Sequence, residues 1–297
     1  MTVPVAAPVV DLKPPLKWAG GKRWLVPHLR SLWAGHEERR LVEPFAGGLA
    51  VALGLNPRRA LLNDANEHLI NFYEWVSAGL VVEQEFENDE AYYYAARSRF
   101  NELVRTGQSR SKEAARWFYY LNRTGYNGLC RFNRKGEFNV PFGRYKTINY
   151  AEDFLEYQAT LSRWEFTSGD FEVAQVEPGD FVYADPPYDV EFTSYSKTSF
   201  GWEEQERLAH WLIGLGVPVV ASNQATPRVL ELYGSLGFEI EILDAPRRIA
   251  CNGDRTPAKE MVATHGLYAN TDLSGSTLGR RASTVKSWVS WVLQQER

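Results

Sequence analysis

Short hydrophobic runs alternate with helical periodicities along much of the chain. The run at 181–184, Phe-Val-Tyr-Ala, is typical of a strand buried on both faces of a parallel sheet. Six further runs predict strands, and three stretches with apolar residues three and four positions apart predict helices. The strand runs begin at Leu41 and lie at 60–64, 164–168, 217–223, 237–242 and 261–264, and the helical stretches lie at 24–32, 49–55 and 66–77. This alternation predicts an α/β fold with a Rossmann-like sheet.

The alternation stops between residues 78 and 160. That segment is helical in pattern at first, with an aromatic-rich helix over 114–121. It then becomes rich in glycine and aromatic residues over 122–145, where Asn-Gly and Lys-Gly pairs favour a hairpin or an irregular loop. We therefore expect a mostly helical insertion that carries a β-hairpin.

This pattern predicts three parts. We expect a discontinuous α/β domain formed by 1–77 and 161–267, the insertion at 78–160, and a C-terminal tail at 268–297. The tail begins with linker-like Ser, Thr and Gly residues and then becomes helical in pattern, and we assign it no function. The length of 297 residues agrees with two domains of about 150 residues each.

Composition excludes several classes of protein. A hydrophobic content of 44%, with 13% aromatic residues, supports a sizeable core and argues against disorder. Cys130 and Cys251 form neither a disulfide framework nor a metal-binding pattern, so we expect a reducing compartment, the cytoplasm, and no metal. Residues 1–15 do not resemble a signal peptide, and no apolar run approaches the roughly 18 residues of a membrane span.

The distribution of charge changes the picture that the net charge of −4 gives. Residues 97–146 contain twelve Lys and Arg side chains against three acids, so this segment carries +9 and the remainder −13. A solvated helical face is one explanation for such a run. The basic residues are interleaved with aromatic ones, which favours contact with a polyanion such as nucleic acid. These aromatic residues are Tyr126, Phe132, Phe138, Phe142 and Tyr145.

Four residues after the buried run, Asp185-Pro186-Pro187-Tyr188, carry candidate chemistry. Proline ends the strand, so these residues belong at the carboxyl edge of the sheet, where open α/β sheets bind ligands. Asp185 and a nearby carbonyl, freed by the prolines, can accept both hydrogens of a planar amine, and Tyr188 can stack on a flat ring. The alternative is a strand-to-loop turn in which Asp185 is only a cap.

Two glycine pairs and one acid suggest a nucleoside site. Gly20-Gly21 follows Trp18, which offers a flat face, although an ordinary helix start explains this stretch equally well. Gly47-Gly48 follows a predicted strand and precedes a helix. Asp64 ends the next strand, 17 residues after Gly47, close to the roughly 20 at which Rossmann-like folds place a ribose-binding acid. Because a P-loop lysine motif is missing, we expect a nucleoside without a triphosphate.

Five stretches together carry a resemblance to a known family. They are 16–22, 43–47, 63–64, 121–146 and 185–188, in order within residues 14–267. On these residues the chain resembles the Dam-type DNA adenine-N6 methyltransferases. The stretch 121–146 is more specific than the Asp-Pro-Pro-Tyr tetrapeptide, which several fold families share.

The resemblance implies S-adenosylmethionine as cofactor and a Rossmann-like methyltransferase domain with an inserted DNA-recognition domain. The implied cofactor-binding residues are Trp18, Lys22, Glu43, Phe45, Ala46, Gly47, Asp64, Asp170 and Asp185. Asp185, Pro186, Pro187 and Tyr188 would form the catalytic motif around a flipped adenine, with the Pro186 carbonyl accepting from its amine. Leu49 departs from the family, which often has a second glycine there, so the resemblance leaves the geometry of that turn open.

The resemblance also implies double-stranded DNA as the substrate and GATC as the leading target. Tyr126 matches an aromatic wedge, Asn127, Leu129, Arg131 and Pro141 match base-reading positions, and Lys17 matches a guanine contact. Further expected DNA contacts are Arg123, Arg144, Tyr145 and Lys146, together with 247–255 near the DNA backbone and 192–201 over the target base. Sequence alone leaves open a solitary enzyme or one paired with a cognate restriction endonuclease. An N4-cytosine enzyme, an RNA methyltransferase and an inactive DNA-binding regulator are the alternatives.

Overall fold

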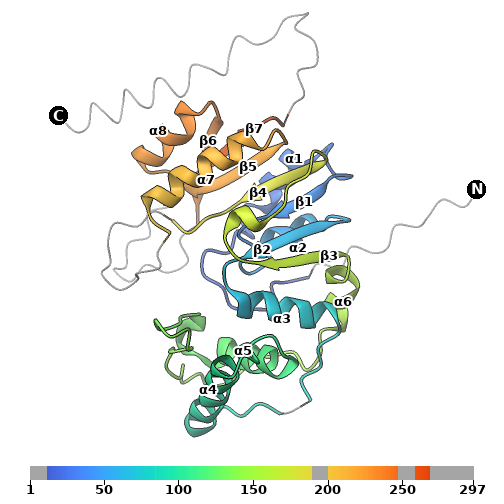
Figure 1. Cartoon of the computed structure of the whole chain (residues 1–297), viewed down its shortest axis with the longest axis vertical. Coiled ribbons are helices and arrows are strands. Elements are labelled where there is room, and N and C mark those ends of the chain that lie inside the picture. The colour runs from blue at the N-terminus through green and yellow to red at the C-terminus, as the bar shows by residue number, and fades with distance from the viewer. Residues whose placement is uncertain (1–11, 84, 189–199, 247–257, 268–297) are drawn as a thin grey trace, which may run out of the picture. The chain divides into compact units, whose positions relative to one another are not determined.

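The computed structural model describes residues 12–83, 85–188, 200–246 and 258–267 (Figure 1). The chain divides into two compact units, residues 1–185 and 186–297. The expected division into a discontinuous catalytic domain and an insertion at 78–160 stays a prediction. Among the described residues, no helix has the combination of length and apolar character that crossing a membrane requires.

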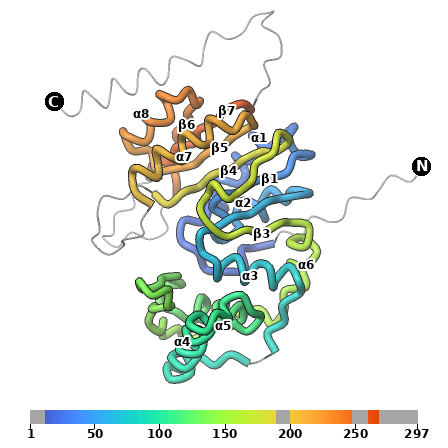
Figure 2. Tube along the Cα trace, viewed as in Figure 1, coloured from blue at the N-terminus to red at the C-terminus, as the bar shows by residue number. Residues whose placement is uncertain are grey.

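The first unit contains most of the helices (Figure 2). In chain order its elements are α1 (Val26–Trp33), β1 (Arg40–Glu43), α2 (Ala50–Leu55), β2 (Ala60–Asp64), α3 (Glu67–Ser77), α4 (Glu90–Arg105), α5 (Lys112–Thr124), η1 (Tyr126–Gly128), α6 (Leu155–Leu161), β3 (Trp164–Ser168), η2 (Phe171–Val173) and β4 (Asp180–Ala184).

A parallel sheet with the order β3-β2-β1-β4 forms the centre of this unit. Val42 of β1 pairs with Leu61 on one side and with Val182 on the other. Every residue of β1 and β4 is buried, as expected for strands of a parallel sheet covered on both faces, and this includes the charged residues at the strand ends, Arg40, Glu43 and Asp180. Strands β2 and β3 follow one another on one side of β1, whereas the next strand, β4, lies on the other side of β1. The position between β1 and β4 is therefore a topological switch point, where open α/β sheets form ligand sites. The predicted Rossmann-like α/β arrangement is confirmed.

The helical segment after β2 is held together mainly by aromatic packing. Helix α5 packs against both α3 and α4. The rings of Phe72 on α3 and Tyr119 on α5 stack with centroids 5.4 Å apart and an interplanar angle of 8°. The side chains of Asp89 and Ser111 accept backbone hydrogen bonds at the starts of α4 and α5, as N-cap residues do. The aromatic-rich stretch 114–121 thus forms part of a helix, as predicted, and most of its side chains are buried.

The second unit contains α7 (Trp202–Gly214), β5 (Val219–Gln224), α8 (Pro227–Ser235), β6 (Glu239–Ala245) and β7 (Ala258–His265). Strand β7 lies between β5 and β6 and is antiparallel to both. Asn223 of β5 lies opposite Met261 of β7, and Gln224 opposite Glu260. This register brings polar residues of two strands together at one end of the unit.

Candidate active site and nucleic-acid interface

Charged residues gather at the carboxyl ends of β1 and β4, on the two sides of the switch point. The ammonium of Lys22 lies 2.7 Å from a carboxylate oxygen of Asp185, directly after β4. Glu43, the last residue of β1, is only 2% exposed. Burial raises the pKa of Glu43 well above its usual range, and the nearby charge of Asp185 raises it further. The site thus pairs one ammonium with one carboxylate beside a second carboxyl group that favours its protonated form.

The glycine turn after β1 is shaped around Trp18. A Cβ atom at Gly47 would lie 3.0 Å from the indole nitrogen of Trp18, and one at Gly48 would lie 2.9 Å from its Cβ atom. Gly47 also has a positive φ of 47°. Larger residues at these two positions would collide with the indole, so the glycines permit close packing of the turn on a flat aromatic face.

Leu49 settles the turn geometry that the sequence left open. It has φ 61° and ψ 23°, the left-handed conformation that glycine adopts most easily, and its side chain is fully buried. The backbone therefore keeps a glycine-like turn while a leucine side chain fills the core beneath it. The conformation costs an L-residue about 1–2 kcal/mol, which buried packing offsets.

Asp64 is held beside this turn by backbone donors. One carboxylate oxygen accepts from the Gly47 amide at 3.0 Å, and the other accepts from the Asn66 amide at 2.9 Å. Burial raises the pKa of Asp64, and these two hydrogen bonds oppose the shift. The two residues whose spacing suggested a ribose-binding acid are thus in direct contact, and the ribose role of Asp64 stays a prediction.

The remaining predicted cofactor residues lie on loops at the same edge of the sheet. The Ala46 amide donates to the Asn63 carbonyl at 2.8 Å. The Phe45 ring lies 5.8 Å from that of Phe171 between centroids. The Asp170 side chain accepts from the Glu172 amide and caps η2. Asp170 therefore shapes the loop after β3.

Sequence reasoning missed two supporting residues. The amide nitrogen of Asn63, a fully buried side chain, donates to the Pro44 and Gly169 carbonyls, both at 3.1 Å. It thereby joins the loop after β1 to the loop after β3. The Tyr73 hydroxyl donates to the Gly47 carbonyl at 2.7 Å. A polar residue inside the apolar run 60–64 was the available signal for Asn63, whereas Tyr73 looks like an ordinary core residue of α3.

The second half of the tetrapeptide, in the second unit, is tied to buried polar residues. The Pro187 carbonyl accepts from the Gln205 side chain at 2.8 Å, and the Tyr188 hydroxyl donates to Glu260 at 2.6 Å. The expectation that the prolines free the nearby carbonyls therefore fails for Pro187, because Gln205 supplies a donor. The described residues place no such donor on the Pro186 carbonyl.

Lys17 makes hydrogen bonds to the end of α5, just before the glycine-rich segment 125–145. Its main chain exchanges two hydrogen bonds with the Asn122 side chain, at 2.9 and 2.8 Å. Its ammonium donates to the Arg123 carbonyl at 2.9 Å and lies 3.8 Å from the centroid of the Tyr145 ring. Burial lowers the pKa of Lys17, and the positive charge of Arg123 lowers it further. Lys17 therefore joins the segment before α1 to the loop predicted to read DNA.

The loop after α5 presents two large apolar side chains to solvent. Tyr126 is 50% exposed and Leu129 is 41% exposed. Between them, Asn127 adopts a positive φ of 53°. The amide of Tyr126 donates to the Pro141 carbonyl at 2.9 Å, which fixes the loop's base. Exposed aromatic and aliphatic tips on a fixed base suit insertion between stacked bases.

A small hairpin completes this surface, with an antiparallel bridge between Phe132 and Phe138. Arg131 donates to the Asn139 side chain at 2.8 Å, so its guanidinium is oriented before any ligand binds. Arg144 has a positive φ of 49° and lies 3.4 Å from Glu90. The guanidinium of Arg123 donates to the Asn149 carbonyl, and Lys146 is exposed.

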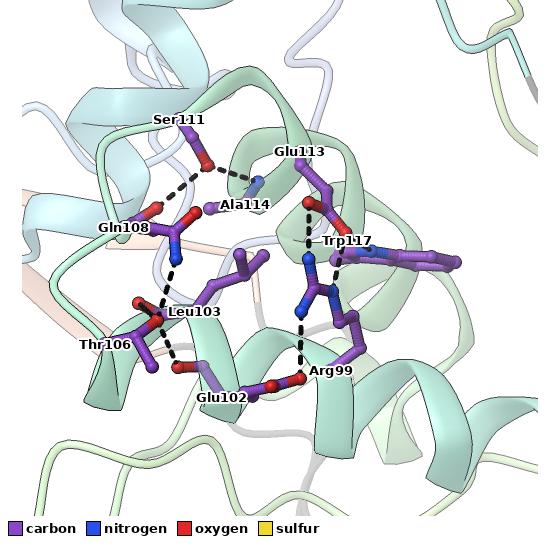
Figure 3. Close-up of polar contacts among 9 residues, drawn as sticks. All are labelled: Arg99, Glu102, Leu103, Thr106, Gln108, Ser111, Glu113, Ala114 and Trp117. Atoms are coloured by element: carbon purple, nitrogen blue, oxygen red, sulfur yellow. Dashed lines mark hydrogen bonds and ion pairs between the residues drawn. The ribbon is translucent and has the colours of Figure 1, made fainter.

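Much of the positive charge of residues 97–146 is paired within the protein. Arg99 lies between Glu102 and Glu113, and Glu113 also accepts from the Trp117 indole (Figure 3). Three further ion pairs are Arg105–Glu137, Arg110–Glu74 and Lys112–Glu83. For these helical positions the solvated-face explanation holds. Arg134, Lys135 and Lys146, in and after the hairpin, are exposed and make no ion pair within the described residues, so their charges are available to a polyanion.

Several predicted features lie outside the described residues. These are most of the expected loop at 192–201, the segment 247–255, the tail 268–297, and Cys251.

Comparison with known proteins gives consistent matches. The model of a family described as "D12 class N6 adenine-specific DNA methyltransferase" matches residues 18–249. The chain is 37% identical over 283 residues to "Type II methyltransferase M1.LlaDCHI" of Lactococcus lactis subsp. cremoris, covering 88% of this chain and 97% of that protein. It is 36% identical over 270 residues to the DNA adenine methylase of Escherichia coli strain K12, covering 84% and 94%.

A third relative is longer. The "DNA N-6-adenine-methyltransferase" of Escherichia phage P1 is 38% identical over 258 residues, which cover 80% of this chain and 33% of that protein. The match therefore spans about a third of the phage protein's length.

Proposed function

Because the chain belongs to the D12 class of N6 adenine-specific DNA methyltransferases, we propose that Asp185, Pro186 and Tyr188 hold the adenine whose N6 amine is methylated. The single observation that carries this proposal is the Lys22–Asp185 ion pair at the switch point of the sheet. Ligands of open α/β sheets bind at such points.

The residues at the sheet edge fit S-adenosylmethionine as the methyl donor. A buried oxygen of Glu43 makes no hydrogen bond to any described residue and could accept from an ammonium group. Asp64 presents a carboxylate for a ribose diol, Trp18 offers a flat face at the glycine turn, and Lys22 offers a cation for a carboxylate. When bound, this cofactor supplies an electrophilic methyl group on a sulfonium.

The remaining predicted cofactor residues have supporting roles in this proposal. Phe45 and Asp170 shape the loops after β1 and β3, and Ala46 and Gly47 supply the main chain on which the donor lies. The hydrogen bonds of Asn63 and Tyr73 keep these loops in place. A preformed pocket avoids part of the ordering cost of binding.

Asp185 and the Pro186 carbonyl act as acceptors for the two hydrogens of the adenine amine. Acceptors on both hydrogens align the nitrogen lone pair and stabilise the positive charge that develops on nitrogen. The Tyr188 ring stacks on the base. A base inside a duplex cannot reach these groups, so the adenine must be flipped out of the helix. The enzyme forms no covalent bond to its substrate in this mechanism.

Recognition falls to the insertion at 78–160, and double-stranded DNA is the substrate. Tyr126 enters the base stack, and Lys17 contacts a guanine. Asn127, Leu129, Arg131 and Pro141 read base edges, with Arg131 suited to bidentate contact with guanine. Arg123, Arg144, Tyr145 and Lys146 position phosphates or support the loop. We propose GATC as the target, which equal methylation rates on GATC and on singly substituted sites would contradict.

The cellular location of the enzyme and its biological role are two further parts of the proposal. Since the substrate is DNA, we place the enzyme in the cytoplasm. One relative's name, "Type II methyltransferase", supports a restriction–modification role with a cognate endonuclease. Expression of the chain should then protect host DNA from an endonuclease that cleaves the same site. If methylation maps to a site for which the host carries no endonuclease, the solitary role is favoured.

The roles of the active-site residues can be tested with three variants. We expect Asp185→Ala to abolish methyl transfer while preserving DNA binding. Tyr126→Ala should weaken DNA binding and preserve cofactor binding, because its side chain is half exposed and belongs to the loop after α5. Glu239→Ala, which removes an exposed carboxylate of β6, serves as the matched control. Methyl transfer by Asp185→Ala at the wild-type rate would contradict the proposal.

A further inference from the structure

Three polar side chains are almost completely buried behind the second half of the tetrapeptide. Gln205 on α7 and Asn223 on β5 are fully buried, and Glu260 on β7 is 1% exposed. Burying such groups is unfavourable unless hydrogen bonds compensate. Their hydrogen bonds are therefore informative about what they hold in place.

Gln205 and Asn223 form a relay from the sheet to Pro187. The Asn223 side chain accepts from the Gln224 amide at 2.8 Å and donates to Gln205 at 2.9 Å. Gln205 in turn donates to the Pro187 carbonyl at 2.8 Å. Because proline has no N–H, this carbonyl is the only main-chain group by which Pro187 can be held.

Glu260 holds the next residue, Tyr188, at the far end of its ring. The phenol donates to a carboxyl oxygen of Glu260 at 2.6 Å, a short hydrogen bond. Glu260 lies in the central strand, opposite Gln224 of β5 and Leu243 of β6. Its backbone is thus fixed from both sides, and its carboxyl group holds the hydroxyl end of the Tyr188 ring through this hydrogen bond.

We propose that Glu260 is a positioning residue for Tyr188, and that Gln205, supported by Asn223, is a positioning residue for the Pro186-Pro187 main chain. The inference rests on the proposed function, in which Tyr188 stacks on the flipped adenine. Stacking on the adenine requires the Tyr188 ring to lie in one plane, and accepting a hydrogen of the amine requires the Pro186 carbonyl to point in one direction. Both are set before DNA binds, so ordering of these groups is not required in the transition state.

The test removes the Tyr188–Glu260 hydrogen bond from each side. Glu260→Ala and Tyr188→Phe should each lower kcat by about tenfold to a hundredfold, since small misplacement of reacting groups has effects of this size. The double variant should be no slower than the slower single variant, because both changes remove one interaction. KM for DNA and the Kd of S-adenosylmethionine should change less than about threefold. Glu260→Gln keeps an acceptor and should restore most of the rate.

A spectroscopic signal reports the ring directly. We would use duplexes in which 2-aminopurine, a fluorescent base, replaces the adenine that is methylated. The fluorescence of 2-aminopurine depends on whether it stacks on a neighbouring ring after it has flipped out of the duplex. Glu260→Ala should change the bound-state fluorescence in the same direction as Tyr188→Ala, and the control Glu239→Ala should match wild type. Gln205→Met, which removes the donor to Pro187, should lower kcat without this fluorescence change.

Two results separate this inference from the proposed function. If Asp185→Ala abolishes methylation but Glu260→Ala and Tyr188→Phe keep wild-type kcat and fluorescence, the positioning role is overturned and the active site stands. Additive losses in the double variant also overturn it. If Asp185→Ala itself methylates DNA, the proposed function of the site fails. Should Glu260→Ala not fold, Tyr188→Phe and Glu260→Gln test the same bond.

Discussion

The ammonium of Lys22 lies 2.7 Å from a carboxylate oxygen of Asp185, although 163 positions separate the two in the sequence. Lys22 is 4% exposed, and Asp185 is 20% exposed. The pair links the Gly-Gly stretch before α1 to the end of β4, where the charge of Asp185 also raises the pKa of the buried Glu43.

Removing that charge should impair the site. In Lys22→Met, two carboxyl groups share the pocket without a cation, so we expect methyl transfer to fall by about a hundredfold and cofactor binding to weaken. Methylation kinetics and calorimetric titration with S-adenosylmethionine measure the two effects. Arg23→Ala, which removes an exposed neighbouring cation, should behave like wild type. Wild-type kinetics for Lys22→Met would show that the ion pair is dispensable.

The left-handed backbone of Leu49 gives a prediction with a definite sign. Leu49→Gly and Leu49→Ala both lose the buried side chain, but only glycine relaxes at φ 61°. We expect Leu49→Gly to be more stable than Leu49→Ala by about 1 kcal/mol. At Leu53, inside the right-handed α2 helix, the order should reverse by a similar amount. Chemical denaturation of the four variants measures both differences, and the same order at both positions would contradict the strain.

His68 should make stability depend on pH. Its ring stacks on Phe132, with centroids 4.9 Å apart, and burial lowers its pKa. Because the folded pKa is below the unfolded value of about 6.5, the unfolded chain binds more protons as pH falls. The stabilisation is therefore present above about pH 6.5 and is lost at lower pH.

His68→Phe removes the titrating group and keeps an aromatic ring. Its stability should decline less than that of wild type as pH falls from about 7 to 5. The raised pKa values of Glu43 and Asp64 act with the opposite sign, since their stabilising proton is lost as pH rises. They are common to both proteins and cancel in the comparison. Parallel pH profiles of wild type and variant would rule out the role of His68.

Salt dependence should separate DNA-contacting cations from internally paired ones. Arg134→Ala and Lys146→Ala should each weaken DNA binding by a similar factor on all sequences and lower the salt slope by about one. Arg99→Ala should leave the slope unchanged, because Arg99 is engaged by Glu102 and Glu113. Binding isotherms at several salt concentrations measure the slopes. A loss of slope only in Arg99→Ala would contradict this assignment.

Local patterns predicted the parts of the site that depend on neighbouring residues. The apolar run before Asp185 identified β4. The interval from Gly47 to Asp64 predicted a ribose-binding acid, which stays a prediction, and the structure shows that the two residues are in direct contact. The charge count over 97–146 overestimated the positive surface because partners such as Glu74 and Glu83 lie outside the counted window. Only the folded arrangement shows those pairs.

Long-range register accounts for what sequence reasoning missed. Glu260 lies 72 positions after Tyr188, and no motif joins them. The pairing of β7 with β5 places Glu260 opposite Gln224, beside Asn223. Gln205 was likewise unpredictable as a support, since it acts on a carbonyl that a sequence pattern does not mark. For Asn63 the sequence showed a polar residue inside an apolar run, but not the carbonyl to which it donates.

Methyl transfer to DNA is the most direct test of the central claim. Labelled S-adenosylmethionine would be incubated with unmethylated plasmid and either wild type or Asp185→Ala, followed by sequencing that maps modified adenines. We predict label on the N6 position of adenine with wild type alone, at one short sequence. Sequence-specific DNA binding by wild type without any methyl transfer would contradict the proposed site and favour a DNA-binding regulator that retains the fold.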